Sequence, residues 1–464
     1  MYEWLTKERI VDLQPVVPVP SPVRNKCEFT FGYRYLFDTD TDQTATTTND
    51  DGTSKTTEPN DSTATTDPPS TTDTKTPACR GKVASLGFMA TGWAGGVVRP
   101  HVCDNISSEA CAIVDVVDDF LKTSPLPPYD SREHVGMWKT LTVRSSRRTR
   151  ECMVIITHSP ASGGAGEKED TTIDYAQHFD SEKERLVSVL LAAELPVPDQ
   201  DPMKVTSVFF QEYDDISHPG PDHPVQHVYG KTYLSEQVGK CTFQISPGAF
   251  FQVNTAGAEI LFSKVVEKVR EVCKDAGKTL LFDVCCGTGT IGLTCMKEGV
   301  VGHVVGVDIS EPAIRDARRN ASLNGFGDDS SEEQGSNVDI CEQKVKFVAG
   351  RAEDVLAKEI GKAKESGLHF VAVVDPAREG LHPDVLRTLR LNKRIDRVVY
   401  VSCNPTGSLV RDVGLLCAPP TKRYGGLPFR IESAVPVDMF PLTSHCEMVM
   451  TFDRLTAEEE AARG

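Results

Sequence analysis

Short apolar runs alternate with amphipathic stretches through the second half of the chain. Buried-strand patterns occupy residues 280–283, 303–308, 345–350, 370–375 and 398–401. Runs of this kind are typical of strands that are buried on both faces of a parallel sheet. A helix is predicted between two of them, at residues 312–323. We therefore predict an α/β fold for residues 235–454, with a parallel sheet that helices cover on both faces.

Residues 23–234 show a different pattern. Short β-like runs and one helical segment lie at residues 83–90, 140–146, 152–158, 204–213 and 113–121. This mixture predicts a separate α+β domain. The remaining assignments are an N-terminal extension at residues 1–22, a C-terminal tail at 455–464 and a Pro- and His-rich loop at 217–230.

The acidic charge of the chain is unevenly distributed. The formal net charge is -17, but residues 38–77 hold nine acidic and two basic side chains, and residues 325–343 hold six acidic and no basic ones. The first segment is rich in Thr, Asp, Ser and Pro and almost lacks apolar residues, so we expect a disordered insertion. The second is expected to form an acidic loop. The rest of the surface is therefore far less acidic than the total indicates.

The cysteines and the hydropathy of the chain indicate the cellular compartment in which the protein is expected. The chain has 14 cysteines without a CxxC spacing, which indicates free thiols in a reducing compartment and argues against an iron–sulfur cluster. The histidines show no metal-ligand spacing, so we expect no metal. No apolar run is long enough to span a bilayer, and the first twelve residues lack the apolar centre of a signal peptide. We expect an intracellular monomer, in the cytoplasm or nucleus rather than the mitochondrion.

Cys403 is the first candidate for chemistry. It follows the apolar run at residues 398–401, and Asn404 and Pro405 then end the strand. The thiol is thereby placed at the carboxyl end of a parallel strand, which is the edge where ligands bind in open α/β sheets. From this position alone the thiol is either reactive or a small apolar group that packs in a core.

A glycine loop follows the predicted strand at residues 280–283, which ends in Asp283. Gly287, Gly289 and Gly292 leave the backbone free to approach a ligand at the N-terminus of the next helix. Asp308 ends the next strand about 20 residues further on, where its carboxylate can accept hydrogen bonds from both ribose hydroxyls. The motif predicts an adenosine-type ligand without choosing between a nicotinamide cofactor and S-adenosyl-L-methionine.

Two more carboxylates lie beside predicted strands. Asp375 ends the run at residues 370–375, ahead of a helix that begins near His382, and can hold an amide-like edge of a substrate or cap the helix. Glu447 lies beside the alternating apolar residues of the last strand. Burial there raises a carboxyl pKa toward the range of a general base, whereas an exposed edge position leaves a charge that faces water.

Five ordered motifs carry a resemblance to a known family. They are FFQVN at residues 250–254, DVCCGTGTIG at 283–292, VDPAREGL at 374–381, YVSCNP at 400–405 and SHCEM at 444–448. The chain from about residue 23 to 454 thereby resembles the RNA 5-methyluridine methyltransferases. Residues 418–454 and the motif VRNKCEF at 23–29 are most similar to the homologue A branch of the eukaryotic tRNA enzymes.

The resemblance implies a Rossmann-like methyltransferase domain, S-adenosyl-L-methionine as cofactor, and tRNA as partner, with the T-loop uridine as target. It implies that Cys403 is the nucleophile that adds to carbon 6 of uracil, and that Glu447 is the base that removes the proton from carbon 5. Gln252, Asp308 and Asp375 match family positions that contact the methyl donor or orient the reacting groups. The preceding α+β domain is implied to bind RNA.

A basic segment of that domain is a candidate RNA contact. Lys139, Arg144, Arg147, Arg148 and Arg150 lie on or beside a predicted strand. We interpret the segment as a contact to the RNA backbone, and the alternative is an ordinary basic face in water.

The sequence departs from the family at the cofactor loop, where Cys285 and Thr290 replace a tyrosine and an asparagine of bacterial relatives, and at Ala377, where a proline is frequent. Two other functional classes stay open. A nicotinamide-dependent oxidoreductase would use the glycine loop but gives Cys403 and Glu447 no task. A catalytically inert RNA-binding or tRNA-folding protein would keep the fold without needing the thiol.

Overall fold

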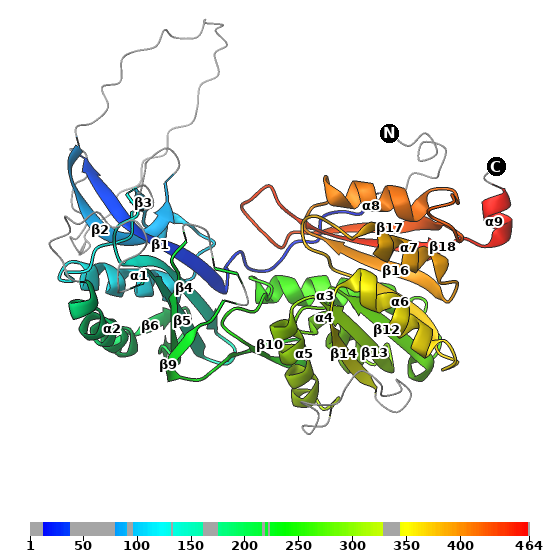
Figure 1. Cartoon of the computed structure of the whole chain (residues 1–464), viewed down its shortest axis with the longest axis horizontal. Coiled ribbons are helices and arrows are strands. Elements are labelled where there is room, and N and C mark those ends of the chain that lie inside the picture. The colour runs from blue at the N-terminus through cyan, green and yellow to red at the C-terminus, as the bar shows by residue number, and fades with distance from the viewer. Residues whose placement is uncertain are drawn as a thin grey trace, which may run out of the picture.

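The computed structural model describes residues 13–37, 79–90, 96–130, 133–160, 175–215, 219–220, 223–327 and 344–462. The predicted insertion at residues 38–77 and nearly all of the predicted acidic loop at 325–343 lie outside the described residues. Figure 1 shows two sheet-based halves side by side. None of the described helices combines the length and the apolar composition that crossing a bilayer requires.

The second half is built on a seven-stranded sheet in the order β14-β13-β12-β15-β16-β18-β17. Its strands are β12 (Thr279–Val284), β13 (His303–Asp308), β14 (Val345–Ala349), β15 (His369–Val374), β16 (Ile395–Ser402), β17 (Phe429–Val437) and β18 (Glu447–Arg454). The five strands from β12 to β16 pair in parallel, and β18 runs antiparallel to both of its neighbours.

Helices cover both faces of this sheet (Figure 1). They are α3 (Thr255–Arg270), α4 (Thr290–Lys297), α5 (Glu311–Leu323), α6 (Ala352–Ala363), α7 (Pro383–Leu391) and α8 (Ser408–Cys417). Helices α3 to α5 share one apolar cluster with the sheet, and α6 to α8 share another on its opposite face. The predicted α/β fold is confirmed, and the apolar runs of the sequence are the central strands because both of their faces are buried.

The strand order places a ligand site. The chain proceeds from β12 outward to β13 and β14, then crosses over to β15 on the other side of β12. The crossover connections therefore diverge at the carboxyl ends of β12 and β15, which leaves a crevice at that point. The glycine loop and Asp375 follow directly after these two strands.

The first half contains a second seven-stranded sheet in the order β3-β2-β1-β4-β5-β8-β9. These strands are β1 (Lys26–Phe37), β2 (Cys79–Met89), β3 (Val97–Val98), β4 (Trp138–Ser146), β5 (Glu151–His158), β8 (Ser207–Glu212) and β9 (Gln226–Gly230). Helices α1 (Ser108–Leu121) and α2 (Tyr175–Ala192) share one apolar cluster with this sheet. The predicted loop at residues 217–230 is wrong in its last part, because Gln226–Gly230 pairs with β8 as an edge strand.

Two short hairpins and three short helices complete the described elements. They are β6 (Leu195–Val197), β7 (Gln200–Met203), β10 (Leu234–Val238), β11 (Cys241–Ile245), the 3-10 turns Pro100–Val102 and Ala276–Lys278, and α9 (Ala457–Ala461). The predicted boundary at residue 235 falls inside β10 and stays a prediction.

The two halves share an apolar core. Met153 and Ile155 of β5 belong to the same cluster as Phe243 of β11 and Val265 of α3, whereas Val154 of β5 packs on the opposite face with α1 and α2. The side chains of β5 therefore alternate between two cores, and the first sheet is buried on both faces.

The basic segment at β4 and β5 is part of this junction, so the expected RNA contact is not supported. Arg144 is 3% exposed and donates to the carbonyl of Ala249 at 3.0 Å. Arg148 donates to Glu259 of α3 at 2.8 Å. The other three basic side chains also have partners: Lys139 with the Tyr213 and Asp215 carbonyls, Arg147 with Glu109, and Arg150 with the Asp201 and Pro202 carbonyls. Each of these cations thus has a partner within the protein, and Lys139 and Arg144 are buried.

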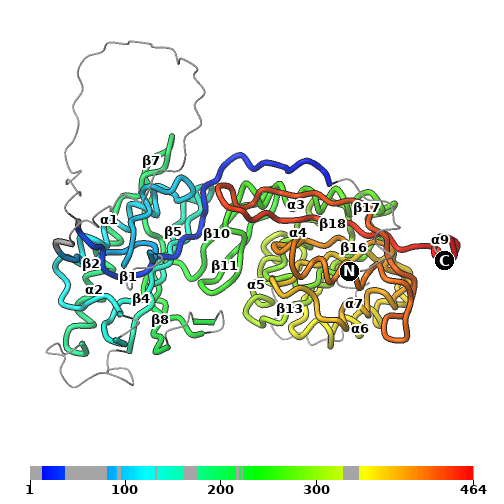
Figure 2. The backbone as a smooth tube through the Cα atoms, turned by 90° about the horizontal axis from the view of Figure 1, so that it is seen from above, coloured from blue at the N-terminus to red at the C-terminus, as the bar shows by residue number. Residues whose placement is uncertain are grey.

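Residues 13–25, which we call the strap, cross from the second sheet to the first. Leu13 and Val17 form isolated parallel bridges with Ala434 and Val437 of β17, and the amide of Val17 donates to the carbonyl of Pro436 at 2.9 Å. The blue tube in Figure 2 runs along the top of the second half before it enters β1. The strap therefore covers the outer edge of β17, which would otherwise expose unpaired backbone groups.

Candidate active site

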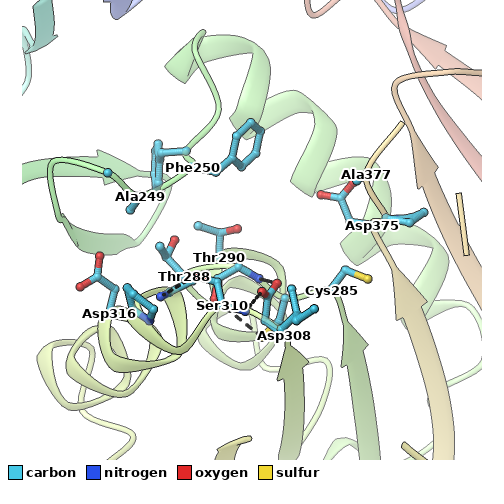
Figure 3. Close-up of a pocket in the computed structure, with 18 of the residues that line it drawn as sticks. Ala249, Phe250, Cys285, Thr288, Thr290, Asp308, Ser310, Asp316, Asp375 and Ala377 are labelled. Atoms are coloured by element: carbon cyan, nitrogen blue, oxygen red, sulfur yellow. Dashed lines mark hydrogen bonds between the residues drawn. The ribbon is translucent and has the colours of Figure 1, made fainter. Parts of the chain in front are cut away.

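A cavity of about 1230 Å³ opens at the carboxyl ends of β12, β13, β15 and β16. All five residues that the sequence singled out line it: Gln252, Asp308, Asp375, Cys403 and Glu447. Figure 3 shows Ala249 and Phe250 across the cavity from Thr288, Thr290 and Asp308, with Asp375 and Ala377 on a further side. Side chains from segments 150 residues and more apart in the sequence thus converge on one space.

The glycine loop forms one wall of the cavity. Gly287 has a φ of +52°, and a Cβ built on it would meet nothing within 4 Å, so the bare backbone faces open space. A Cβ on Gly292 would lie 2.9 Å from the carboxylate of Asp283, which accepts a hydrogen bond from the Gly292 amide at 2.8 Å. The buried carboxylate thereby fixes the first turn of α4 against the end of β12.

Asp308, the last residue of the neighbouring strand β13, binds the glycine loop. Its carboxylate accepts hydrogen bonds from the amide of Gly287 at 2.8 Å and from the amide of Ser310 at 2.9 Å (Figure 3). Each carboxylate oxygen has further acceptor capacity beyond its one bond. The last residue of β13 therefore both orders the glycine loop and presents an acceptor to the cavity.

Cys403 is a half-buried residue directly after β16, at the cavity edge that the sequence predicts. Burial raises the pKa of its thiol, and the carboxyl groups of Glu447 and Asp375 raise it further, whereas the guanidinium of Arg378 lowers it. Without a ligand the thiol is therefore protonated at neutral pH, and it faces groups whose charge controls its ionisation.

Glu447 is buried, at 4% exposure, as the first residue of β18. Burial first, and Asp375 second, raise its pKa to about 8, against the opposing effect of Arg378. Its Oε2 atom is buried and makes no hydrogen bond to any described residue. The alternative of an edge-strand charge in water is wrong, and the carboxylate is free to bond a ligand.

Asp375 lies between the glycine loop and the Cys403–Glu447 pair. Burial, together with the charges of Asp283 and Asp308, raises its pKa to about 7. It does not cap α7, because His382 is the N-cap residue of that helix. Three ionisable groups with raised pKa values thus meet in one cavity, as is typical of catalytic sites.

Arg378 is a cationic residue of the cavity to which the sequence assigned no role. The side chain of Asn404, next to Cys403, donates to the Arg378 carbonyl at 3.1 Å. The loop is also fixed by Asp412 of α8, which is fully buried and accepts from the Leu381 amide at 2.7 Å. Arg378, whose cation lowers the pKa values of both Cys403 and Glu447, is therefore fixed at its main chain by the residue that follows the cysteine.

Gln252 lies in the loop between β11 and α3, as predicted, and is 8% exposed. Its backbone carbonyl accepts a hydrogen bond from the side chain of Asn25 at 3.2 Å. No described residue forms a hydrogen bond with its side-chain amide, although Gln252 lines the cavity. The amide is thus available to a ligand.

Two further arginines line the cavity, Arg24 of the strap and Arg315 of α5. Among the described residues, neither guanidinium has an ion pair or hydrogen bond, whereas Arg319 and Arg351 of the same cavity pair with Asp316 and Glu353. Arg24 lies inside the motif VRNKCEF, but its sequence position alone does not show that it reaches the cavity.

Phe250 also lines the cavity, and 71% of its surface is exposed. Within the described residues, no group of three or more His, Cys, Asp or Glu side chains could hold a metal ion.

Comparisons with known proteins agree with this architecture. A family model described as "Methyltransferase domain" matches residues 274–356. The crystal structure of Pyrococcus abyssi tRNA (uracil-54, C5)-methyltransferase in complex with S-adenosyl-L-homocysteine has a TM-score of 0.57 and 21% sequence identity, over 94% of this chain and 78% of that one. This likeness confirms the predicted Rossmann-like methyltransferase fold with an additional N-terminal domain.

Curated sequences show closer relatives. Human tRNA (uracil-5-)-methyltransferase homolog A is 36% identical over 360 residues, which cover 77% of this chain and 51% of the human protein. Homolog B of Pongo abelii is 35% identical over 379 residues, which cover 81% of this chain and 70% of that protein. The chain spans about half the length of the homolog A relatives. With homolog B matched at this identity over more than two thirds of its length, the chain belongs to the tRNA (uracil-5-)-methyltransferase family.

Proposed function

We propose that the protein methylates carbon 5 of a uridine in tRNA, with S-adenosyl-L-methionine as methyl donor and Cys403 as covalent nucleophile. The observation that supports this most strongly is the meeting of Cys403 and Glu447 in one cavity with the glycine loop, since the reaction needs a thiol and a base at the same ring. A location inside the cell and a monomeric state stay predictions from the sequence.

The cavity residues fit the proposed cofactor. The bare backbone at Gly287 leaves room for an adenosine-type group, and the Asp308 carboxylate would accept bonds from ribose hydroxyls. Gln252 and Asp375 would contact the polar part of the methyl donor. When bound, S-adenosyl-L-methionine supplies the methyl group and a positive sulfonium charge. The cavity of about 1230 Å³ exceeds the roughly 300–1,000 Å³ of ordinary small-molecule pockets, so a nucleotide can enter beside the cofactor.

Cys403 supplies the nucleophile. Carbon 5 of uracil is too weak a nucleophile by itself, but a thiolate that adds to carbon 6 forms a carbon–sulfur bond and moves the ring electrons onto the carbon 4 oxygen as an enolate. Carbon 5 of the enolate then takes the methyl group. Arg378 lowers the thiol pKa and so favours the thiolate that the first bond requires.

Glu447 completes the reaction. After methylation, carbon 5 carries both the methyl group and its original hydrogen. The ionised Glu447 carboxylate takes that proton, the electron pair re-forms the ring double bond, and the carbon–sulfur bond breaks to release the Cys403 thiolate. A pKa of about 8 makes the ionised carboxylate a stronger base than an ordinary glutamate, and it lies close to neutral pH, where a general base is most effective.

The names of the relatives support tRNA as the substrate, and the homologue A resemblance favours its T-loop uridine. Arg24 and Arg315 provide cations at the cavity for phosphates that flank a uridine turned into the site. A nucleic acid can thus be held locally, although the whole chain is acidic.

A methylation assay with covalent trapping tests the proposal. The purified protein is incubated with an unmodified tRNA transcript and S-adenosyl-L-methionine, and 5-methyluridine is measured by mass spectrometry. We expect Cys403→Ala to abolish the product. Glu447→Gln should accumulate a protein–RNA band that survives denaturing electrophoresis, because the ring cannot expel the thiolate.

Cys446→Ala is the matched thiol control. Cys446 precedes Glu447 in the sequence but does not line the cavity, so its substitution should leave turnover unchanged. Full turnover by Cys403→Ala would refute covalent catalysis. If the unaltered protein refolds tRNA without methylating it, and Cys403→Ala does so equally well, the inert RNA-binding alternative is correct.

A further inference from the structure

Asn25, the last residue of the strap, lies where three parts of the molecule meet. Its backbone amide donates to the carbonyl of Val253 at 2.6 Å, and its carbonyl accepts from the amide of Ser145 in β4 at 2.8 Å. One residue thus joins the first sheet to the loop that carries Gln252. This backbone pairing fixes the side chain of Asn25 above the loop.

The side chain of Asn25 makes two more bonds to the same loop. Its Nδ2 atom donates to the carbonyl of Gln252 at 3.2 Å and to the hydroxyl of Thr255 at 2.9 Å. Both of its N–H donors are therefore used on residues at the two ends of a four-residue segment, which ends at the start of α3.

A buried carboxylate extends this contact to the first sheet. The hydroxyl of Thr255 donates to Glu236 at 2.8 Å, and the other oxygen of Glu236 accepts from the hydroxyl of Ser146 in β4 at 2.9 Å. Glu236 is 2% exposed. A continuous set of hydrogen bonds therefore links β4, the strap and the start of α3, and the main chain of Gln252 is attached to it through Asn25.

The side chain of Gln252 has no such support. It is nearly buried and lines the cavity, and none of the described residues bonds its amide. Its direction therefore depends on the backbone to which it is attached. In the described structure that backbone is held at its carbonyl by Asn25, a residue 227 positions away in the sequence.

We propose that Asn25 is a positioning residue of the cofactor site, which holds the main chain of Gln252 so that the Gln252 amide faces the methyl donor. This inference rests on the proposed function only in assigning Gln252 to the methyl donor. Asn25 touches neither cofactor nor substrate and acts through Gln252. It makes the first domain a structural component of cofactor binding.

A double-mutant cycle tests the proposal, with S-adenosyl-L-homocysteine as the probe and isothermal calorimetry as the readout. Asn25→Ala removes two side-chain hydrogen bonds and should weaken binding of the probe about tenfold, which corresponds to the net free energy of one or two hydrogen bonds. Gln252→Ala should weaken binding by a similar factor. The double variant should bind no more weakly than Gln252→Ala alone, because Asn25 acts only through that side chain.

Controls separate positioning from general destabilisation. Val17→Ala lies in the same strap and removes apolar packing against the core, at a residue whose backbone pairs with β17. It should lower the melting temperature without changing the affinity for the probe. Asn25→Asp keeps the size of the side chain but cannot donate to the Gln252 carbonyl, so it should repeat the effect of Asn25→Ala and serves if the alanine variant does not fold.

The outcomes distinguish this inference from the proposed function. The positioning role would be overturned if both Asn25 variants bound the probe with unchanged affinity. It would also be overturned if the losses of affinity in Asn25→Ala and Gln252→Ala multiplied in the double variant. A protein that binds the probe, shows the expected cycle and fails to methylate tRNA would leave the positioning role intact and refute the function. Absence of probe binding by the unaltered protein would overturn both.

Discussion

Release of the methylated product from Cys403 should depend on pH through Glu447. Its pKa is raised to about 8 by burial and by Asp375, and only the ionised carboxylate can take the carbon 5 proton. The resolution rate of the covalent adduct should therefore rise with pH and level off above pH 8. The ionised fraction is about one in eleven at pH 7 and about ten in eleven at pH 9, so the rate should rise about tenfold between them.

Single-turnover experiments between pH 6 and 9.5 measure this step. Protein, tRNA and S-adenosyl-L-methionine are mixed, samples are quenched in denaturant, and adduct and 5-methyluridine are quantified at each time. Because the thiol pKa of Cys403 is raised as well, formation of the adduct should also accelerate with pH, and following both species separates the two steps. In Glu447→Gln, any residual resolution should not vary with pH.

One result would refute this reasoning. If the resolution rate of the unaltered protein is constant from pH 6 to 9, Glu447 is either not the base or not held in the buried site that raises its pKa. A rate that rises while Glu447→Gln shows the same rise would assign the pH dependence to another group.

Three other outcomes are expected. Glu447→Gln should raise the melting temperature at pH 8.5. A carboxyl group whose pKa is raised on folding destabilises the folded protein as the pH increases from about 4.5 to about 8, and glutamine cannot ionise. The gain should vanish near pH 4, and an equal gain at both pH values would contradict this reasoning. Asp308→Ala should weaken S-adenosyl-L-homocysteine binding at least tenfold by calorimetry, because two hydrogen bonds of the loop and the ribose acceptor are lost. Arg24→Gln should weaken tRNA binding and reduce the slope of log affinity against log salt by about one, whereas the exposed Arg423→Gln, outside the cavity, should not.

The sequence predicted the central sheet and the ends of its strands because a parallel sheet buries both faces of each strand. Asp308, Asp375 and Cys403 were placed correctly at one edge, since Asp308 ends such a strand and the other two follow directly after one. Glu447 and Gln252 needed the family resemblance, because their burial depends on elements that are remote in the sequence.

The basic segment shows the limit of sequence reasoning. Arg147 and Arg148 read as a surface for RNA, because a sequence shows a charge but not its partner. Their partners, Glu109 and Glu259, are 38 and 111 positions away. Arg24 shows the opposite case, since its route to the cavity depends on the path of the strap across the molecule.

The path of the strap also has a consequence for synthesis on the ribosome. Leu13 and its partner Ala434 are 421 positions apart, so a nascent chain carries this segment unpaired until β17 has been translated. The first sheet, which ends at Gly230, can assemble much earlier, since domains generally fold in order as they emerge. Closing the edge of the second sheet therefore comes at the end of synthesis, and the apolar Val17 and Val19 lack their contacts with the core of the second half until then.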